Sequence, residues 1–243
     1  MKKLVPGSLG FILLTILSGS APAADLSRRA PVHTKAPIMA PGYDWSGIYI
    51  GINGGGGWGT SRFDFPGLGT TTGDFTTSGA LLGGTIGVNW QTSNVVLGLE
   101  GDGDWASITG SSPCPIARFA CTTTDTWLAT ARARLGIAAN AWLLYVTGGG
   151  AFGDVQMGVN GPVAFAGQTA TRSGWTVGGG YEYGLAPGWS LKGEYLHVDL
   201  GTAACSIPNC STFSVVNTPF RTEIVRAGLN YRFNWGGPIM ARY

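Results

Sequence analysis

Apolar side chains alternate with small or polar ones along most of this chain. In one stretch, Leu97 and Leu99 alternate with Gly98 and Glu100. Successive side chains of a β-strand point to opposite faces, so this period indicates strands with two different faces. Glycine makes up 41 of the 243 residues, which disfavours long helices. The sequence therefore predicts an all-β fold.

The alternation recurs in about eight successive segments. They start near Gly47, Leu82, Val95, Trp127, Trp142, Trp175, Trp189 and Val225. Each is expected to be a strand of about ten residues. Long connections, such as one of about 20 residues from Gly59, alternate with short ones such as Gln91 to Asn94. This arrangement is typical of an up-and-down meander.

The two faces of these strands point to a membrane. Charged residues make up 12% of the chain, against about 25% in a typical soluble domain. The apolar faces end in aromatic residues, and four of these are expected beside the short turns: Trp90, Trp142, Trp175 and Trp189. Aromatic girdles of this kind mark a membrane interface. Because backbone groups in lipid must all be paired, we expect an eight-stranded antiparallel transmembrane β-barrel.

An eight-stranded barrel has a lumen that side chains fill. The alternation places ten charged residues on the inward face, five acidic and five basic: Glu100, Asp102, Asp104, Glu182, Glu194, Arg132, Arg134, Lys192, Arg226 and Arg232. Charges removed from bulk water are costly unless they are paired. We therefore expect an internal ion-pair network that plugs the lumen, with its main contacts between the third and fourth strands.

The N-terminal region carries an export signal. A pair of lysines precedes an apolar run from Leu9 to Leu17, and small residues lead to Ala21-Pro22-Ala23. This pattern is typical of a secretory signal peptide over residues 1–23, with cleavage after Ala23. Residues 24–42 are rich in Pro and Ala and are expected to form a periplasmic tether. Residues 43–243 are then the barrel domain.

The four cysteines form two close pairs, Cys114 with Cys121 and Cys205 with Cys210. In an exported protein such cysteines are expected to be oxidised, and local pairing is favoured among the three connectivities. A zinc site is the alternative. It is disfavoured because the spacing is not of the C-x-x-C type and the chain has only 2 His.

Three motifs suggest sharper activities. The glycine run from Gly54 to Gly59 fits a phosphate-binding turn, but no helical period follows it. The acidic triplet from Glu100 to Asp104 resembles the start of a calcium loop but lacks the rest of that loop. His197 and Asp199 invite comparison with outer-membrane proteases, yet parity places His197 on the face opposite to Asp102. No catalytic residue, metal or cofactor is therefore expected.

Several blocks in register resemble the outer-membrane immunogenic protein family: Trp45-Ser-Gly-Ile-Tyr-Ile-Gly, Gly87-Val-Asn-Trp-Gln, Gly98-Leu-Glu-Gly-Asp, Arg132-Ala-Arg-Leu-Gly, Trp189-Ser-Leu-Lys-Gly-Glu-Tyr and Leu229-Asn-Tyr-Arg-Phe. These are small eight-stranded barrels, often grouped with porin-like opacity proteins. The resemblance implies a Gram-negative outer membrane, long loops outside, assembly by the barrel insertion machinery and a role as a surface antigen. Such barrels commonly finish on an aromatic residue, so Phe233 or Tyr243 serves as the insertion signal.

The leading hypothesis is a non-enzymatic envelope protein whose loops contact the surroundings, surface glycolipid or a host. The alternative is a narrow porin-like channel, because the lumen carries charges. An outer-membrane protease is the third hypothesis. The basic residues are scattered, which argues against a nucleic-acid partner, and the sequence defines no oligomer interface.

Overall fold

The computed structural model describes residues 43–115, 118–162, 167–207, 209–210 and 215–233. The expected signal peptide, the cleavage site at Ala23, the tether over residues 24–42 and the aromatic Tyr243 lie outside the described residues. Among the described residues, no helix is long and apolar enough to cross a bilayer.

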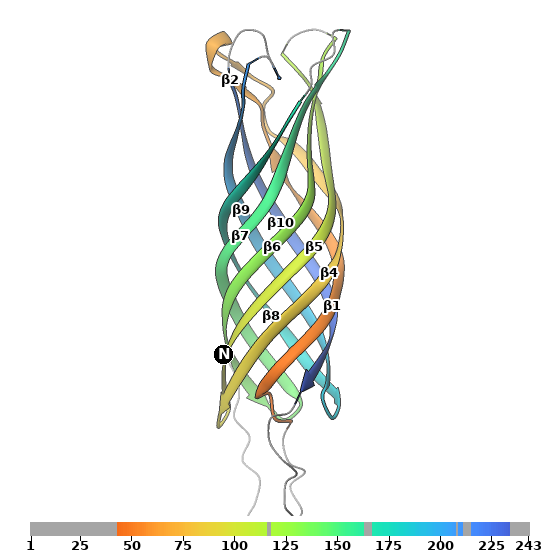
Figure 1. Ribbon diagram of the computed structural model, residues 1–243, viewed down its shortest axis with the longest axis vertical. Coiled ribbons are helices and arrows are strands. Elements are labelled where there is room, and N and C mark those ends of the chain that lie inside the picture. Colours follow the sequence, from red (N-terminus) through yellow and green to blue (C-terminus); the bar gives the residue numbers. More distant parts are fainter. Residues whose placement is uncertain (1–42, 116–117, 163–166, 208, 211–214, 234–243) are drawn as a thin grey trace, which may run out of the picture. The chain divides into compact units, whose positions relative to one another are not determined.

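Eight long antiparallel strands form a closed ring (Figure 1). Each strand pairs with its sequence neighbours, and pairing of the first with the last strand, for example Ile50 with Tyr231, closes the ring. The predicted eight-stranded meander is thereby confirmed. The strands are β1 (Gly47–Ser61), β4 (Phe75–Thr92), β5 (Val95–Pro113), β6 (Ala120–Ala139), β7 (Trp142–Asn160), β8 (Gln168–Ala186), β9 (Trp189–Cys205) and β10 (Val216–Phe233).

The strands are longer than expected. They contain 15 to 20 residues instead of about ten, because each continues beyond its apolar stretch toward the end with the long connections. In that upper part the outward residues are mostly Thr, Ser and Gly, so the apolar signal fades although the ladder continues. A β-bulge in β6 also reverses the alternation, so that Trp127 points outward but Asp125 points inward.

A small hairpin fills the connection between β1 and β4. It consists of β2 (Asp64–Phe65), the 3-10 turn η1 (Pro66–Leu68) and β3 (Thr70–Thr71), and β2 pairs with β10. The expected loop from Gly59 is therefore shorter and more ordered than predicted. The hairpin brings Phe63 and Phe65 into the upper part of the barrel interior, where both are buried.

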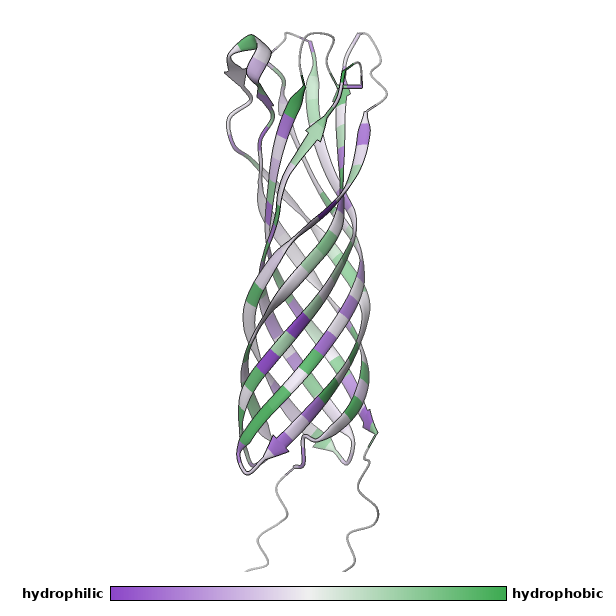
Figure 2. Ribbon diagram, turned by 60° about the vertical axis from the view of Figure 1, so that its left-hand side comes forward, coloured by the Kyte–Doolittle hydropathy of each residue, from purple (hydrophilic) through white to green (hydrophobic). Residues whose placement is uncertain are grey.

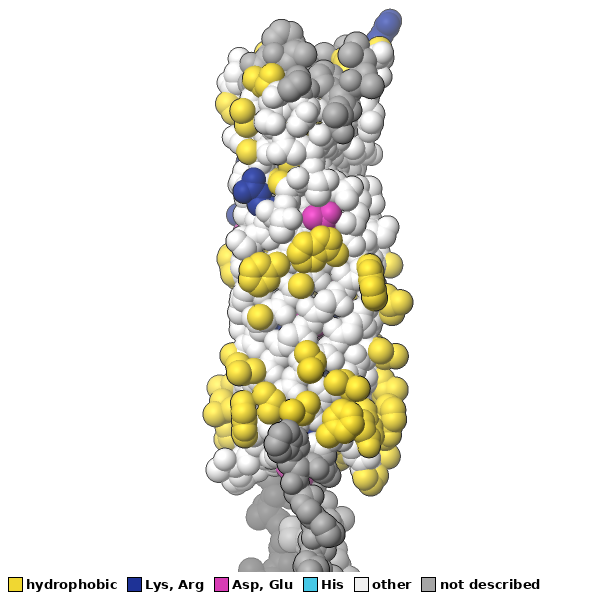
Figure 3. All heavy atoms as spheres, viewed as in Figure 1, with side chains coloured by type: hydrophobic (Ala, Val, Ile, Leu, Met, Phe, Trp, Pro, Cys, Tyr) yellow, Lys and Arg dark blue, Asp and Glu magenta, His cyan; other side chains and the backbone are white. Residues whose placement is uncertain are grey.

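The outer surface carries two bands of exposed hydrophobic side chains (Figure 3). The lower band includes Trp90, Trp142 and Trp189, which lie beside the short turns as expected. The upper band includes Trp58, Trp105, Trp127 and Trp175. The placement of Trp175 beside a short turn was wrong, because it lies within β8 and pairs with Asp199 of β9. We take the wall between the two bands as the membrane-spanning segment.

Buried and exposed residues alternate along most of the strand length, and hydrophobic and hydrophilic residues follow one another along the ribbons of the lower part (Figure 2). Glycines on the inward face allow close approach of neighbouring strands. A Cβ atom on Gly83 would lie 2.3 Å from the carbonyl oxygen of Gly103 and 2.1 Å from Oδ1 of Asp104. A Cβ atom on the outward Gly103, in contrast, would meet no other atom within 4 Å.

Substitution Gly83→Ala should lower the free energy of unfolding by about 1–3 kcal/mol, because the backbone of β5 must move to accept the methyl group. The control Gly103→Ala should leave it unchanged or slightly higher. Urea titration of the refolded protein in detergent measures both. Equal stability of the two variants would contradict this packing of β4 against β5.

Candidate functional site: a sealed lumen

All ten charged residues that the alternation assigned to the lumen are buried. They come from five strands, and each is at most 7% exposed. They are Glu100, Asp102 and Asp104 of β5, Arg132 and Arg134 of β6, Glu182 of β8, Lys192 and Glu194 of β9, and Arg226 and Arg232 of β10.

Arg132 links opposite sides of the lumen. Its Nη2 atom lies 2.5 Å from Oε1 of Glu100 and 3.0 Å from Oδ2 of Asp102, both on the neighbouring β5. Its Nη1 atom lies 2.9 Å from Oε1 of Glu194, which belongs to β9. The expectation that the contacts lie mainly between the third and fourth strands was therefore too narrow. A lumen of this width lets one guanidinium reach across it.

Arg226 forms a second bridge. It contacts Asp102, lies 2.8 Å from Oδ2 of Asp104, and donates from Nε to Oε2 of Glu194 at 2.9 Å. Arg132 and Arg226 thus share Asp102 and Glu194. Because the four groups have common partners, the loss of one should weaken the others.

A third group surrounds Arg134. Its Nη2 atom donates to Oε1 of Glu182 at 2.7 Å, and its guanidinium lies 3.9 Å from the ring centre of Tyr145. Lys192 donates to Glu100 at 3.1 Å. Arg232 lies over the ring of Tyr43 at 4.5 Å.

Two tyrosines also belong to the network, and their role was not predicted from the sequence. Tyr49 donates its hydroxyl hydrogen to Glu100 at 2.7 Å, and Tyr145 donates to Glu194 at 3.0 Å. Both side chains lie on the inward parity of their strands. The alternation therefore predicts that both side chains face the lumen, but their role as neutral hydrogen-bond donors cannot be recognised from charge.

Apolar residues close the lumen below the charges. Trp45, Val96, Leu143 and Tyr145 form a buried cluster at the end with the short turns, and Tyr43 packs against it. The backbone N–H of Trp45 donates to Oε1 of Gln91 at 2.8 Å, and the Tyr43 hydroxyl donates to the carbonyl oxygen of Trp189 at 3.1 Å. The segment before β1 therefore packs against the lower end of the lumen.

A larger apolar cluster fills the interior above the charges. Leu196 and Ile224 continue the inward rows of Glu194 and Arg226, and both are fully buried. The cluster also contains Phe63, Ile108, Leu128, Val198, Leu200 and Phe220. The sequence predicted a charged, glycine-rich lumen, and this upper apolar cluster was not expected.

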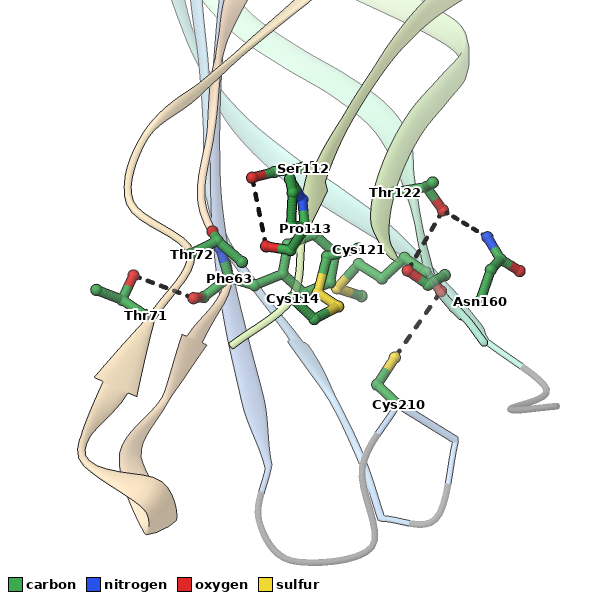
Figure 4. The surroundings of a disulfide bond; sticks show 12 residues. Phe63, Thr71, Thr72, Ser112, Pro113, Cys114, Cys121, Thr122, Asn160 and Cys210 are labelled. Atoms are coloured by element: carbon green, nitrogen blue, oxygen red, sulfur yellow. Dashed lines mark hydrogen bonds between the residues drawn. A yellow bond between two sulfur atoms is a disulfide. The ribbon is translucent and has the colours of Figure 1, made fainter. Parts of the chain in front are cut away.

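The two disulfides belong to this upper apolar cluster. Cys114 is bonded to Cys121 and Cys205 to Cys210, with Cα–Cα distances of 5.2 and 5.9 Å. Figure 4 shows that the Cys114–Cys121 disulfide lies between Phe63, which precedes β2, and Cys210. These are the local pairs expected from the spacing. Because each of the four cysteines takes part in a disulfide, none of them is free to bind zinc.

The sharper motifs do not assemble into sites. The glycine run from Gly54 to Gly59 lies inside β1, so no helix opens there. The three carboxylates of the acidic triplet in β5 form ion pairs with Arg132 and Arg226. His197 faces outward, with Nδ1 2.6 Å from Oε1 of Glu223 and its ring 5.2 Å from that of Trp175. Asp199 likewise contacts Arg221 at 2.9 Å, away from the inward carboxylates.

Two buried carboxyl groups lie above the membrane-spanning segment. Asp125 of β6 is fully buried next to Asp154 of β7. Burial, and then the nearby Asp154 carboxylate, raises the pKa of Asp125 to about 8. Asp154 keeps a lowered pKa because the Thr126 hydroxyl and the Thr126 and Trp127 backbone N–H groups donate to it.

The raised pKa predicts a pH-dependent stability. The folded state holds the Asp125 proton more tightly than the unfolded chain, so stability falls as pH rises from about 4 to about 8. Asp125→Asn should raise the urea midpoint at pH 9 and change it little at pH 4. The exposed control Asp74→Asn should have no effect at either pH. An unchanged midpoint of Asp125→Asn at pH 9 would contradict the assignment.

The ion-pair network predicts a large effect of the double substitution Arg132→Leu with Arg134→Leu. It leaves Glu100, Asp102 and Glu182 buried with fewer partners, and loss of one partner of a buried pair costs about 3–5 kcal/mol. The matched control, Arg62→Leu with Arg221→Leu, removes two exposed arginines and should cost far less. Folding yield and the urea midpoint decide, and equal losses would refute the network.

Comparison with known proteins agrees with this architecture. Residues 11–233 match the outer membrane protein beta-barrel domain family. The 31 kDa outer-membrane immunogenic protein of Brucella melitensis biotype 1 is 39% identical over 251 residues, covering 96% of this chain and 100% of that protein. The 22 kDa outer membrane protein of Rhizobium leguminosarum bv. viciae is 30% identical over 167 residues, covering 68% of each chain.

Among solved structures, the crystal structure of the outer membrane protein OprG from Pseudomonas aeruginosa covers 79% of this chain and 99% of its own. Its TM-score is 0.44 at 13% sequence identity. The family match and the relative at 39% identity carry the assignment. The chain is a Gram-negative outer-membrane β-barrel and belongs to the outer-membrane immunogenic protein family.

Proposed function

We propose that this protein is a non-enzymatic, non-conducting barrel that strengthens the outer membrane and displays its upper loops at the cell surface. The observation that carries the proposal is the filling of the lumen in three successive layers. Aromatic and aliphatic side chains fill the lower end, ion-paired residues the middle, and a large apolar cluster the upper end.

The charged layer favours closure over conduction. A pore for ions needs charged groups that a passing ion can contact and leave. Here Arg132 and Arg226 each contact more than one carboxylate at salt-bridge distance, and their side chains are at most 1% exposed. The narrow-channel alternative rests on the presence of these charges and on the many glycines of the strands. An ion entering the lumen would have to break several of these pairs and cross both apolar layers.

The outward position of His197 supports a role without catalysis. Its partner Glu223 and its neighbour Asp199 face the membrane interface, whereas Asp102 and Asp104 face the lumen. These groups share no space in which a water molecule could be activated. The protease hypothesis would be supported by peptide cleavage that is lost in His197→Ala, and we expect no cleavage by either protein.

Two partners belong to this proposal. The barrel insertion machinery would recognise Phe233, which ends β10 with an exposed aromatic side chain, or the aromatic Tyr243. The second partner is surface glycolipid, which would surround the wall at the level of the upper aromatic band.

Conductance in a planar bilayer tests the closed state. The refolded protein, verified by a heat-dependent shift in gel mobility, should give no current steps under conditions in which a general porin conducts. Reproducible ohmic steps that scale with salt concentration would contradict the proposal and support the narrow channel.

A further inference from the structure

A row of charged and polar residues faces outward on one side of the barrel, level with the upper aromatic band. Asp199, Arg221 and Thr60 are direct neighbours on β9, β10 and β1. Trp175 precedes Asp199 in this row. Below them lie His197, Glu223 and Trp58 in the same order. Ionisable groups near lipid are costly and usually pair with one another, and here Asp199 contacts Arg221 and His197 contacts Glu223.

A polar pocket lies at the upper edge of this row. It has a volume of about 150 Å³ and is lined by Thr60, Ser61, Arg62, Asp74, Pro219 and Arg221. Trp58, two residues before Thr60, is 47% exposed. Because exposed tryptophans of a barrel lie at the headgroup level of the membrane, the pocket faces the headgroups of the outer leaflet.

The two arginines of the pocket, Arg62 and Arg221, are oriented by carboxylates and still have N–H donors for a ligand. Asp199 accepts from Nε of Arg221 at 2.9 Å, and 65% of the Arg221 side chain is exposed. Asp64 holds Nε of Arg62 at 3.0 Å. In both pairs the carboxylate orients the guanidinium through Nε. The terminal amino groups can then donate to a ligand, and guanidinium groups bind phosphate with paired hydrogen bonds.

From this arrangement we propose that the pocket binds a phosphate group of an outer-leaflet glycolipid. Arg62 and Arg221 hold the phosphate, Thr60 donates a hydrogen bond, and Trp58 packs against the lipid below. The proposal rests on the outer-membrane location and not on the closed lumen, so current steps in a bilayer would leave it intact.

Asp74 opposes this binding and provides a directional test. Its Oδ1 atom lies 3.5 Å from Nη1 of Arg62, and 69% of its side chain is exposed. The Asp74 carboxylate therefore competes weakly with a phosphate for Arg62, and its negative charge repels the phosphate. Removing this carboxylate should strengthen lipid binding, a result that a purely structural role of the charges does not predict.

The experiment measures lipid binding to the full refolded protein in detergent by native mass spectrometry. The probes are diphosphoryl lipid A, the same lipid without phosphates, and inorganic phosphate. We expect the wild type to bind the phosphorylated lipid at least tenfold more tightly than the dephosphorylated one. Arg62→Gln with Arg221→Gln should abolish this difference, whereas the exposed control Arg118→Gln should keep it. Asp74→Asn should bind more tightly than the wild type.

Four results would overturn the proposal. They are equal affinity for the two lipids, retention of the difference in the double variant, weaker binding by Asp74→Asn, and full displacement of the lipid by millimolar inorganic phosphate. Dimers that disappear in the double variant without a change in lipid binding would instead assign the row to an interface between two copies. The gel-mobility shift on heating verifies that each variant is folded.

Discussion

Closure of eight strands into one ring is the constraint on which the rest of this structure depends. In lipid every backbone N–H and C=O group needs a partner, and pairing of β1 with β10 supplies the last ladder. A ring of this size has a narrow interior. Inward side chains are therefore buried, and inward charges are stable only when they are paired. The links from Arg132 to Glu194 and from Arg226 to Asp104 follow from that geometry.

Alternation along the chain was sufficient to predict the ring and the inward charges, because the period of a strand is a local property. It was not sufficient to predict which charges meet. Arg132 and Glu194 lie on strands that are not neighbours, and their contact depends on the stagger and width of the closed ring. The same holds for Tyr49 and Glu100, which belong to β1 and β5.

The packing of the upper part of the barrel was not predicted from the sequence. There the outward face meets water, so the contrast between the two faces weakens although Leu196 and Ile224 still follow the inward parity. The bulge before Trp127 shifts the pattern of β6 by one residue, which brings Asp125 inside. The apolar cluster and both disulfides make this part of the barrel a packed apolar layer, where the sequence predicted loops.

The central claim is that the lumen charges form one coupled network. A double-mutant cycle of Arg226→Met and Glu194→Gln, measured as free energies of unfolding in urea, tests it most directly. The network predicts a coupling energy of at least about 1 kcal/mol, because the two residues form a direct ion pair and each has a further partner in the network, Asp102 for Arg226 and Arg132 for Glu194. Additive effects within about 0.5 kcal/mol would show that the residues act independently and would contradict the account.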